Sequence, residues 1–599
     1  MRIIFSFFLG LVLSFYLSEV IVNAWRKHVK KSISRHFHHS SLGLILIIAS
    51  FVLFFFEIPF ITGSNQLLLS LFAAGSGVGV ILHHFLRESF VFSEKIEKNF
   101  LRKHETGLDR FLEILPGGLT WIALTSPIWL SFTLPFAVAY LILLADVYWL
   151  VSALRIAFLI ITGYRKMEYA KKQNWIEKLD GNFPDNWKNY YHLIALPTYQ
   201  EPLEILLPAF NAVVNSDYPK DKIFLSVGFE QREFDKNPEK IRKALAYLEK
   251  LGEKVGGVFT TIHPTNLPGE IPGPGTNRNY MIRNAAQEFK KRGIPAERIL
   301  VTTLDADFVI HQKFLAGALH KYLSTPENIR DKRSYTGVFL YYNNYWQAPT
   351  PMRLIAAGTA FWQLSEMVGS DKYMNFASMS INLKSLLDIG LWIPDKVNDD
   401  SGFYWKAYYH FNGDYKVLPH FLPISADTVL DVTLFKTLQN QYLQQKRWAY
   451  GVEHIPFIVK QYFRNKRLDF WDKTDKLLFV MWGYLKWGIL ALFVTFAGFL
   501  IPFINPGYTE SVVSRNLPII SSWVLTFAFL GIFATIFVHE KTVPPRPESW
   551  SIIQKVWSYA QWALVPIIIV TISTIPAIDA QTSLMLGRYM EYRATVKDV

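Results

Sequence analysis

Apolar and polar positions divide this chain into three parts. Apolar runs long enough to cross a hydrocarbon layer of about 30 Å lie toward both ends, and a polar stretch of roughly three hundred residues separates them. The first run has a long apolar core without a small-residue cleavage pattern, so we expect an anchor and not a signal peptide. Eight membrane spans are predicted, near residues 3–23, 41–62, 66–86, 118–134, 136–162, 483–504, 517–538 and 559–580.

Within the polar middle, short apolar segments alternate with helical ones. This alternation is typical of βαβ units and predicts an α/β domain with a largely parallel sheet. Strands are expected at 191–196, 223–227, 257–263 and 298–304, and helices at 202–214, 238–250, 277–292 and 311–323. The chain is therefore predicted to contain about five N-terminal spans (1–162), a domain at 163–473 and about three C-terminal spans with a short tail (474–599).

The distribution of charge predicts the orientation of these parts. The formal net charge is +13, and residues 24–40 and 87–116 are rich in Lys and Arg, whereas the turn at 62–65 has none. Because cytoplasmic loops carry the excess of basic residues, the polar middle is predicted to be cytoplasmic in a multi-pass protein of the inner or plasma membrane. The basic balance then indicates membrane lipids and an anionic substrate as partners, and no nucleic acid.

Cysteine is absent from all 599 residues. Disulfides, thiolate catalysis and cysteine-ligated metals are thereby excluded, and the composition is compatible with a reducing compartment.

Polar side chains follow three of the predicted strands, in Pro197–Glu201, Phe229–Glu230 and Asp305–Asp307. The carboxyl ends of parallel strands meet at one edge, where open α/β sheets bind ligands, so these residues predict a site. If the strand continues, Asp305 and Asp307 point the same way, about 7 Å apart. Two such carboxylates can share a divalent cation with a diphosphate, although a structural turn explains the pair equally well.

Two later segments add candidate chemistry. Asn398-Asp399-Asp400 precedes an aromatic helical stretch; local sequence favours a helix cap here, with a general base as the alternative. The amphipathic segment Leu438–Trp448 is basic and ends in Trp, which predicts a helix at the membrane interface, within a set of interfacial helices near 429–465.

Four segments together resemble the ordered motifs of membrane-embedded family 2 glycosyltransferases of the cellulose-synthase type. They are Pro197-Thr-Tyr-Gln-Glu-Pro202, Asp305-Ala-Asp307, Asp400 and Gln444-Gln-Lys-Arg-Trp448, over about residues 190–450. The Q-x-x-R-W element is the most specific. The resemblance implies a GT-A (Rossmann-like) domain between transmembrane bundles, and inverting transfer from a nucleotide-activated sugar, expected to be a UDP-sugar, to a glycan or lipid acceptor.

The resemblance also implies roles for individual residues. Asp305 and Asp307 match the D-x-D that binds the nucleotide and Mg²⁺ or Mn²⁺, an ion that neutralises the leaving diphosphate. Asp400 matches the catalytic base, Arg447 would face the diphosphate with its forked donors, and Trp448 would stack on the acceptor sugar. The further residues expected to bind substrate or nucleotide, or to hold those that do, are Thr198, Glu201, Glu230, Asn277 and Gln444.

Several positions depart from the family pattern. Glu230 stands where an Asp is usual, and Gly273-Pro-Gly-Thr-Asn277 lacks the usual Lys because Pro274 cannot bind phosphate. Asn398-Asp-Asp400 replaces T-E-D, and Phe376–Ser380, the expected acceptor-pocket segment, lacks the family's Cys-Gly. The donor sugar is therefore the least transferable property.

The tail Tyr592-Arg-Ala-Thr-Val-Lys597 resembles the F-x-V-T-x-K gating loop of cellulose-type synthases, with Tyr for Phe and Ala for Val. Three spans after the domain would leave this tail on the opposite side of the membrane. Either 559–580 is re-entrant or interfacial, or the match is accidental.

Three functions remain open from the sequence. The Q-x-x-R-W element and the many spans favour a processive synthase that extends a polysaccharide at the cytoplasmic face and passes it through its own helices. The alternative within the same chemistry is a non-processive transferase that glycosylates a lipid acceptor. From another class, a transporter or receptor with a non-catalytic sugar-nucleotide domain is supported by the altered segment 273–277. Accessory export proteins are not specified by the sequence.

Overall fold

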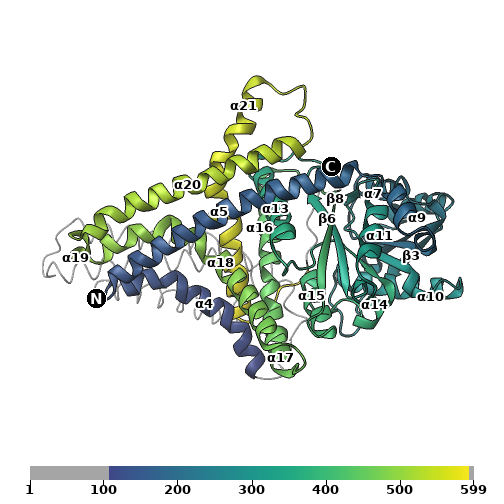
Figure 1. Ribbon diagram of the computed structural model, residues 1–599, viewed down its shortest axis with the longest axis horizontal. Coiled ribbons are helices and arrows are strands. Elements are labelled where there is room, and N and C mark those ends of the chain that lie inside the picture. The colour runs from purple at the N-terminus through teal and green to yellow at the C-terminus, as the bar shows by residue number, and fades with distance from the viewer. Residues whose placement is uncertain (1–106, 593–599) are drawn as a thin grey trace, which may run out of the picture. The chain divides into compact units, whose positions relative to one another are not determined.

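The computed structural model describes residues 107–592, which form a mixed α/β sheet domain flanked in sequence by long apolar helices (Figure 1). The predicted spans at 3–23, 41–62 and 66–86 lie outside the described residues, as do the basic loop 24–40, most of 87–116, and the tail beyond Tyr592.

Five helices of the described chain are long and apolar enough to cross a membrane. They are α4 (Gly107–Ser131), α5 (Pro135–Lys172), α18 (Phe470–Ile504), α20 (Val512–Thr542) and the segment Ile552–Met585. Each coincides with one of the five spans predicted after residue 107, which confirms those predictions as to length and composition. Large apolar side chains such as Phe158 and Phe503 are 69% and 91% exposed, as expected of helix faces that meet lipid.

The last of these segments is not one regular helix. It consists of α21 (Ile552–Ala560), the 3-10 turn η5 (Gln561–Leu564), α22 (Val565–Ile568), the π-helix η6 (Ile569–Thr574) and α23 (Ile575–Met585). Pro566 and Pro576 lack the amide proton that a continuous helix needs, which contributes to the breaks. This segment runs across α18 and α20, not alongside them (Figure 1).

The described chain divides into two compact units. In the smaller one, residues 126–138 and 499–514, the rings of Phe136 and Tyr508 meet edge to face with centroids 5.5 Å apart. There Asn505, which caps the short helix α19 (Pro506–Thr509), donates from Nδ2 to the Ser131 carbonyl at 3.1 Å. The larger unit contains the sheet and the candidate site.

The sheet has eight strands in the order β3-β2-β1-β4-β7-β6-β8-β5. The half β3-β2-β1-β4 is parallel. β1, β2 and β4 are buried on both faces, which explains their apolar runs, whereas the edge strand β3 is partly exposed. The sheet is mixed but largely parallel, as predicted: β6 and β8 also pair in parallel, whereas β7 is antiparallel to β4 and β6, and β5 to β8. The strands are β1 (Tyr191–Pro197), β2 (Ile223–Glu230), β3 (Gly257–His263), β4 (Ile299–Thr303), β5 (Val309–Ile310), β6 (Arg333–Leu340), β7 (Met379–Asn382) and β8 (Lys416–Ser425).

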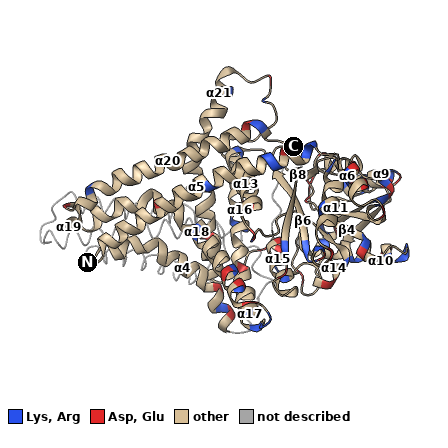
Figure 2. Cartoon of the chain, viewed as in Figure 1, with Lys and Arg blue, Asp and Glu red and all other residues tan. Residues whose placement is uncertain are grey.

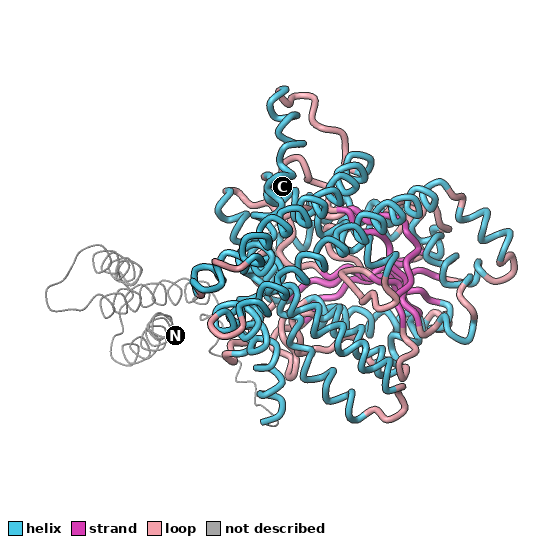
Figure 3. Tube along the Cα trace, turned by 60° about the vertical axis from the view of Figure 1, so that its left-hand side comes forward, coloured by secondary structure: helices cyan, strands magenta, loops and turns pink. Residues whose placement is uncertain are grey.

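Helices enclose the strands (Figure 3). The eight predicted elements of the parallel half are present, with ends within three residues of those expected. The helices of the domain are α6 (Trp175–Asn182), α7 (Leu203–Val214), α8 (Gln231–Phe234), α9 (Pro238–Gly252), α10 (Pro274–Lys291), α11 (Phe314–Ser324), α12 (Glu327–Arg330), α13 (Thr350–Gly369), α14 (Leu383–Ile389), α15 (Asp399–His410), α16 (Leu434–Ala449) and α17 (Ile455–Arg464). The 3-10 turns are η1 (Trp187–Asn189), η2 (Lys220–Lys222), η3 (Ala296–Arg298) and η4 (Tyr450–His454).

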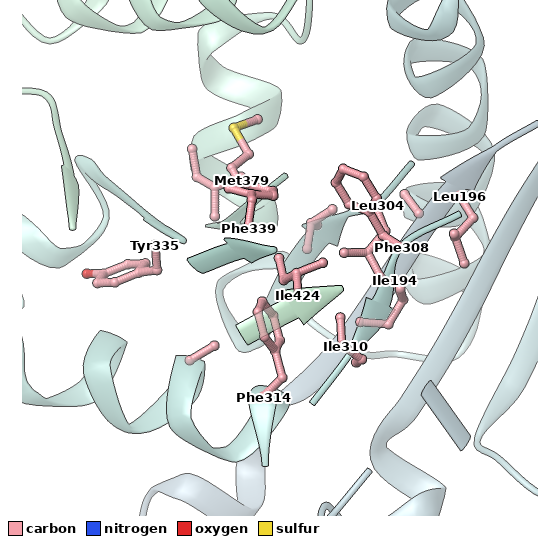
Figure 4. Packing of buried hydrophobic residues seen from close by; sticks show 14 of the residues in the cluster. Ile194, Leu196, Leu304, Phe308, Ile310, Phe314, Tyr335, Phe339, Met379 and Ile424 are labelled. Carbon is pink, nitrogen blue, oxygen red and sulfur yellow. The ribbon is translucent and has the colours of Figure 1, made fainter. Parts of the chain in front are cut away.

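One hydrophobic cluster fixes the turn that carries Asp305 and Asp307. Leu304, Phe308 and Ile310, which flank the two acidic residues, are buried in the main core. Figure 4 shows them with residues of the neighbouring strands, among them Ile194, Leu196, Phe339 and Ile424. The turn is thus anchored on both sides of the carboxylates, so packing limits how far they can move.

Candidate active site

The three polar strand ends predicted to converge do so. β2, β1 and β4 are parallel neighbours, so Glu230 at the end of β2, Thr198 after β1 and Asp305 after β4 lie along one edge of the sheet. This edge is where open α/β sheets bind ligands.

Asp305 and Asp307 lie in the turn beyond β4 and not on the strand. Since β4 ends at Thr303, the alternation from which a common direction was expected does not apply to them. Asp305 is 40% exposed and bonds Arg278, whereas the buried Asp307 accepts the Asp427 amide at 2.8 Å. The two carboxylates therefore bond different partners.

Arg278, which the sequence analysis did not select, lies at the centre of the site. Its side chain is only 1% exposed, and Nη2 meets Oδ1 of Asp305 at 2.7 Å. Nη1 meets Oδ2 of Asp399 at 2.7 Å and Oδ1 of Asp400 at 3.2 Å. Burial lowers the pKa of Arg278, but the three carboxylates outweigh it and raise the pKa above its ordinary value. One guanidinium thus joins the D-x-D turn to the predicted catalytic base.

A signal for Arg278 was present in the sequence. It lies four residues after Pro274, which occupies the position of the missing lysine, and residues four apart share a helix face. A cation one turn further along α10 can therefore reach the same region. The carboxylate partners, about 27 and 121 residues away in sequence, could not be inferred from the spacing.

The neighbours of Arg278 hold the start of α10 in place. Asn277 donates from Nδ2 to the Gly228 carbonyl at 3.0 Å, and Asn279 exchanges two hydrogen bonds with the backbone of Trp392. A Cβ on Gly275 would lie 2.8 Å from Cβ of Asp399, so only glycine permits this approach. Asn277, expected to bind nucleotide, thus directs its amide nitrogen to β2.

Asp399 and Asp400 are the first two residues of α15, and their carboxylates contact Arg278. Asn398, at the cap position, forms no side-chain capping bond, so the capping role favoured by local sequence is wrong here. The segment is held by Glu453, whose Oε1 accepts the amides of Val397 at 2.8 Å and Asn398 at 3.0 Å.

Asp400 has the properties of a poised base. Its side chain is 28% exposed, so an acceptor hydroxyl can approach it. Burial and the neighbouring Asp399 raise the pKa of Asp400 above its ordinary value, while Arg278 and Arg447 act against the rise. A carboxylate with a raised pKa accepts a proton more readily near neutral pH.

The Q-x-x-R-W residues lie at the end of α16, where Arg447 meets Tyr592. The guanidinium of Arg447 lies 4.8 Å from the ring centroid of Tyr592, and its buried Nε has no hydrogen-bond partner within residues 107–592. Trp448 meets Phe376 with ring centroids 6.2 Å apart. Gln444 accepts the side-chain amide of Gln441 at 3.2 Å. Trp448, expected to stack on the acceptor sugar, therefore lies against the expected acceptor-pocket segment Phe376–Ser380.

The remaining predicted residues bond within the protein. Glu201 closes the turn after β1 by accepting the Thr198 hydroxyl at 2.8 Å and the Tyr199 amide at 2.6 Å. Glu230 is buried, with Arg232 and His263 each at 3.5 Å. Glu230 therefore belongs to a charged network at the end of β2.

The carboxylates of the site suit a cation that is shared with substrate phosphates better than a metal site built from protein ligands alone. In the described part of the chain, no group of three or more His, Cys, Asp or Glu side chains is placed to hold a metal ion. Mg²⁺ is commonly held by one or two carboxylates together with substrate phosphates and water. The partly exposed Asp305, with Asp307 two residues on, matches that kind of site.

Comparisons with known proteins place the chain near solved glycosyltransferase structures at low identity. The mannosyltransferase PcManGT from Pyrobaculum calidifontis, solved with GDP-Man and Mn²⁺, is 13% identical with a TM-score of 0.34, covering 71% of this chain and 97% of its own. S. aureus TarS 1–349 with UDP-GlcNAc is 14% identical with a TM-score of 0.32, covering 59% and 93%. No family model and no curated protein matches the chain. Because both TM-scores are below 0.5, the functional assignment rests on the site itself.

Proposed function

We propose that this protein is a membrane-embedded glycosyltransferase of the GT-A class, with its catalytic domain in the cytoplasm. It would transfer a sugar with inversion from a nucleotide donor, expected to be a UDP-sugar, to a growing polysaccharide. The observation that carries the proposal is that Asp305, Asp399 and Asp400 meet on one buried guanidinium, that of Arg278, at the ligand-binding edge of the sheet.

Asp400 would act as the general base. Direct attack by an acceptor hydroxyl on the anomeric carbon requires one group that accepts the hydroxyl proton, and no protein nucleophile. Asp400 is accessible and has a raised pKa, whereas Asp399 is only 8% exposed and fixed at 2.7 Å to Arg278. Asp399 would therefore hold Arg278 in place while Asp400 takes the proton.

The departing diphosphate would be stabilised by positive charge. Arg447 offers a forked set of donors, and its unpartnered Nε is consistent with a ligand at this position. Arg278 supplies a second guanidinium close to where the family lysine is missing. A bound Mg²⁺ or Mn²⁺ would be held by Asp305 and Asp307 and would supply Lewis-acid stabilisation of the leaving group.

Aromatic rings support a glycan acceptor. Trp362, Phe376 and Trp448 form a continuous series, with neighbouring ring centroids 5.8 and 6.2 Å apart. Aromatic faces and edges suit sugar rings, which present both C–H and hydroxyl groups. Together with five helices of membrane-spanning length, this series supports processive extension and export of a polymer over single transfer to a lipid.

The test uses the full-length protein in lipid vesicles with Mg²⁺ or Mn²⁺ and a panel of radiolabelled sugar nucleotides, including UDP-sugars and GDP-mannose. The wild type is expected to transfer sugar from one donor into a long product that is sized by gel filtration. Asp400→Asn should lower the rate at least about a hundredfold, because general-base catalysis contributes on that order.

Asp388→Asn is the matched control, since Asp388 is an exposed carboxylate on α14 and should leave transfer unchanged. A single labelled lipid as product would replace the processive proposal by the non-processive one. Nucleotide binding without transfer from any donor would instead support a non-catalytic sugar-nucleotide domain.

A further inference from the structure

Four cationic side chains line a cavity formed by α5, α6, α11 and β8. The cavity has a volume of about 500 Å³, and its lining includes Arg165, Lys166, Lys178 and Lys321. All its lining residues lie within 107–592, and none of them is Asp or Glu. The concave surface therefore concentrates positive charge without an acidic counterpart.

Two of the four cations, Lys166 and Lys178, lie against aromatic rings. Across the described residues, no ion pair joins any of the four to an acidic side chain. Nζ of Lys166 lies 5.2 Å from the ring centroid of Phe421, and Nζ of Lys178 lies 5.1 Å from that of Trp175. Burial and the charge of Lys166 lower the pKa of Lys321, as expected of like charges that lie close together.

A buried donor and a strained residue lie in the same wall. His420 is 5% exposed, and its Nδ1 accepts the Leu422 amide at 3.3 Å, which leaves Nε2 as the protonated nitrogen. This Nε2 has no acceptor in the part of the chain that the structure describes. The adjacent Phe421 has φ +61°, a conformation that bulky residues rarely adopt and that concentrates at binding sites.

The cavity lies where α5 passes from an apolar to a basic sequence. Thr162 ends the predicted apolar run and lines the cavity, and Arg165 and Lys166 follow within the next helical turn. The 38 residues of α5 span about 57 Å, well beyond a hydrocarbon layer of about 30 Å. Figure 2 shows most of α5 without charged residues and a basic end toward the sheet.

From this arrangement we propose that the cavity binds a phosphate group, with the headgroup of an acidic phospholipid as its source. Basic pockets at the ends of membrane helices suit anionic headgroups, and the aromatic residues of the lining suit the boundary between acyl chains and water. The shared chemistry is a phosphate mono- or diester, so a soluble glycerol phosphate is the competing source.

The test measures lipid binding to the full-length protein by native mass spectrometry, with phosphatidylglycerol and phosphatidylcholine compared in one detergent. A second titration uses glycerol 3-phosphate alone, followed by calorimetry. Lys166→Gln with Lys321→Gln removes two cavity charges, and Lys236→Gln with Lys250→Gln is the matched control at exposed positions. The cavity variant is expected to bind phosphatidylglycerol about 30-fold more weakly, and the control variant as the wild type does.

Each outcome decides the proposal. Selective loss of phosphatidylglycerol binding in the cavity variant supports it with lipid as the source, whereas loss of glycerol 3-phosphate binding alone supports the site with a soluble source. Equal binding by wild type and cavity variant, or no binding of either ligand, overturns it. An unchanged thermal unfolding midpoint establishes that the cavity variant is folded.

Discussion

At the scale of single residues, Arg278 governs the charge of the site. It meets Asp305, Asp399 and Asp400, whose negative charges would otherwise repel one another at close range. The same contacts couple the group expected to bind the nucleotide to the group expected to take the proton. Arg278 is thus the residue through which donor binding can influence the base.

Replacing Arg278 should change the pH dependence of transfer. Under the proposed mechanism Asp400 is active when ionised, so the rate rises with pH through its pKa, and Arg278 lowers that pKa. In Arg278→Gln the pKa should rise further, and the acidic limb of kcat/KM should move to higher pH by about 1–3 units. The measurement is a pH–rate profile for wild type and variant.

Arg278→Lys is the conservative control, because it keeps the charge while losing the forked geometry, and its acidic limb should stay closer to that of the wild type. A folded glutamine variant with the wild-type pH–rate profile would show that Arg278 does not affect the pKa of the base. A lower rate with an unshifted profile would point to a purely structural role.

At the scale of elements, one buried ion pair fixes the helix that carries Arg447 and Trp448. Nζ of Lys446 in α16 meets Oδ2 of Asp579 in α23 at 2.9 Å, and the two side chains are 4% and 1% exposed. Tyr442 donates to the same carboxylate oxygen at 2.9 Å. The position of α16, which carries the proposed diphosphate and acceptor residues, therefore depends on a carboxylate from a segment of membrane-spanning length.

Breaking this pair from one side should destabilise the protein. Asp579→Asn removes the carboxylate that meets the buried Lys446 ammonium, and breaking a buried ion pair from one side typically costs about 3–5 kcal/mol. We expect a lower midpoint of thermal unfolding in detergent and lower transfer activity, because α16 loses its anchor. Differential scanning calorimetry and the transfer assay provide the two readouts.

The double variant Lys446→Met with Asp579→Asn removes both charges and should recover part of the lost stability, since neutral replacement of a buried pair is often tolerated. If the loss of stability in the double variant equals the sum of the losses in Asp579→Asn alone and Lys446→Met alone, the ion pair does not couple the helices.

At the scale of the whole molecule, the described segment that follows α20 returns to the candidate site. Trp550, just before α21, meets Trp346 of the domain with ring centroids 5.1 Å apart. At the other end, Tyr592 lies over Arg447, and a Cβ on Gly273 would be 3.5 Å from it. Both ends of the segment thus contact the domain.

Tyr592 should therefore affect donor use. Its ring covers the guanidinium expected to face the diphosphate, and such cation–π contacts contribute about 0.5–2 kcal/mol. Tyr592→Ala should lower kcat/KM for the donor roughly 2- to 30-fold. Steady-state kinetics with the donor identified by the panel measure the change.

Tyr592→Phe keeps the ring and restores the residue found in the resembling gating loop, so it should stay near wild-type activity. If alanine and phenylalanine variants are equally active, the contact with Arg447 has no part in donor use. If both are equally impaired, the hydroxyl and not the ring is the important group.

Local elements and the chemical types of their residues were predictable without the fold. Alternating apolar and helical segments predicted the strands of the parallel half, and runs of membrane length predicted the five helices found after residue 107. These properties follow from periodicity and burial, which neighbouring residues express. The convergence of three polar strand ends was also predictable, because parallel neighbours share an edge.

Which charged residues meet depends on the fold. The antiparallel entry of β7, the grouping of three carboxylates on Arg278 and the return of Tyr592 to Arg447 all join residues far apart in sequence. Such contacts depend on long-range packing and on the close approach that Gly275 permits, and spacing along one chain does not encode either. The sequence therefore supplied the reactive groups, and the fold set their distances and hence their charge states.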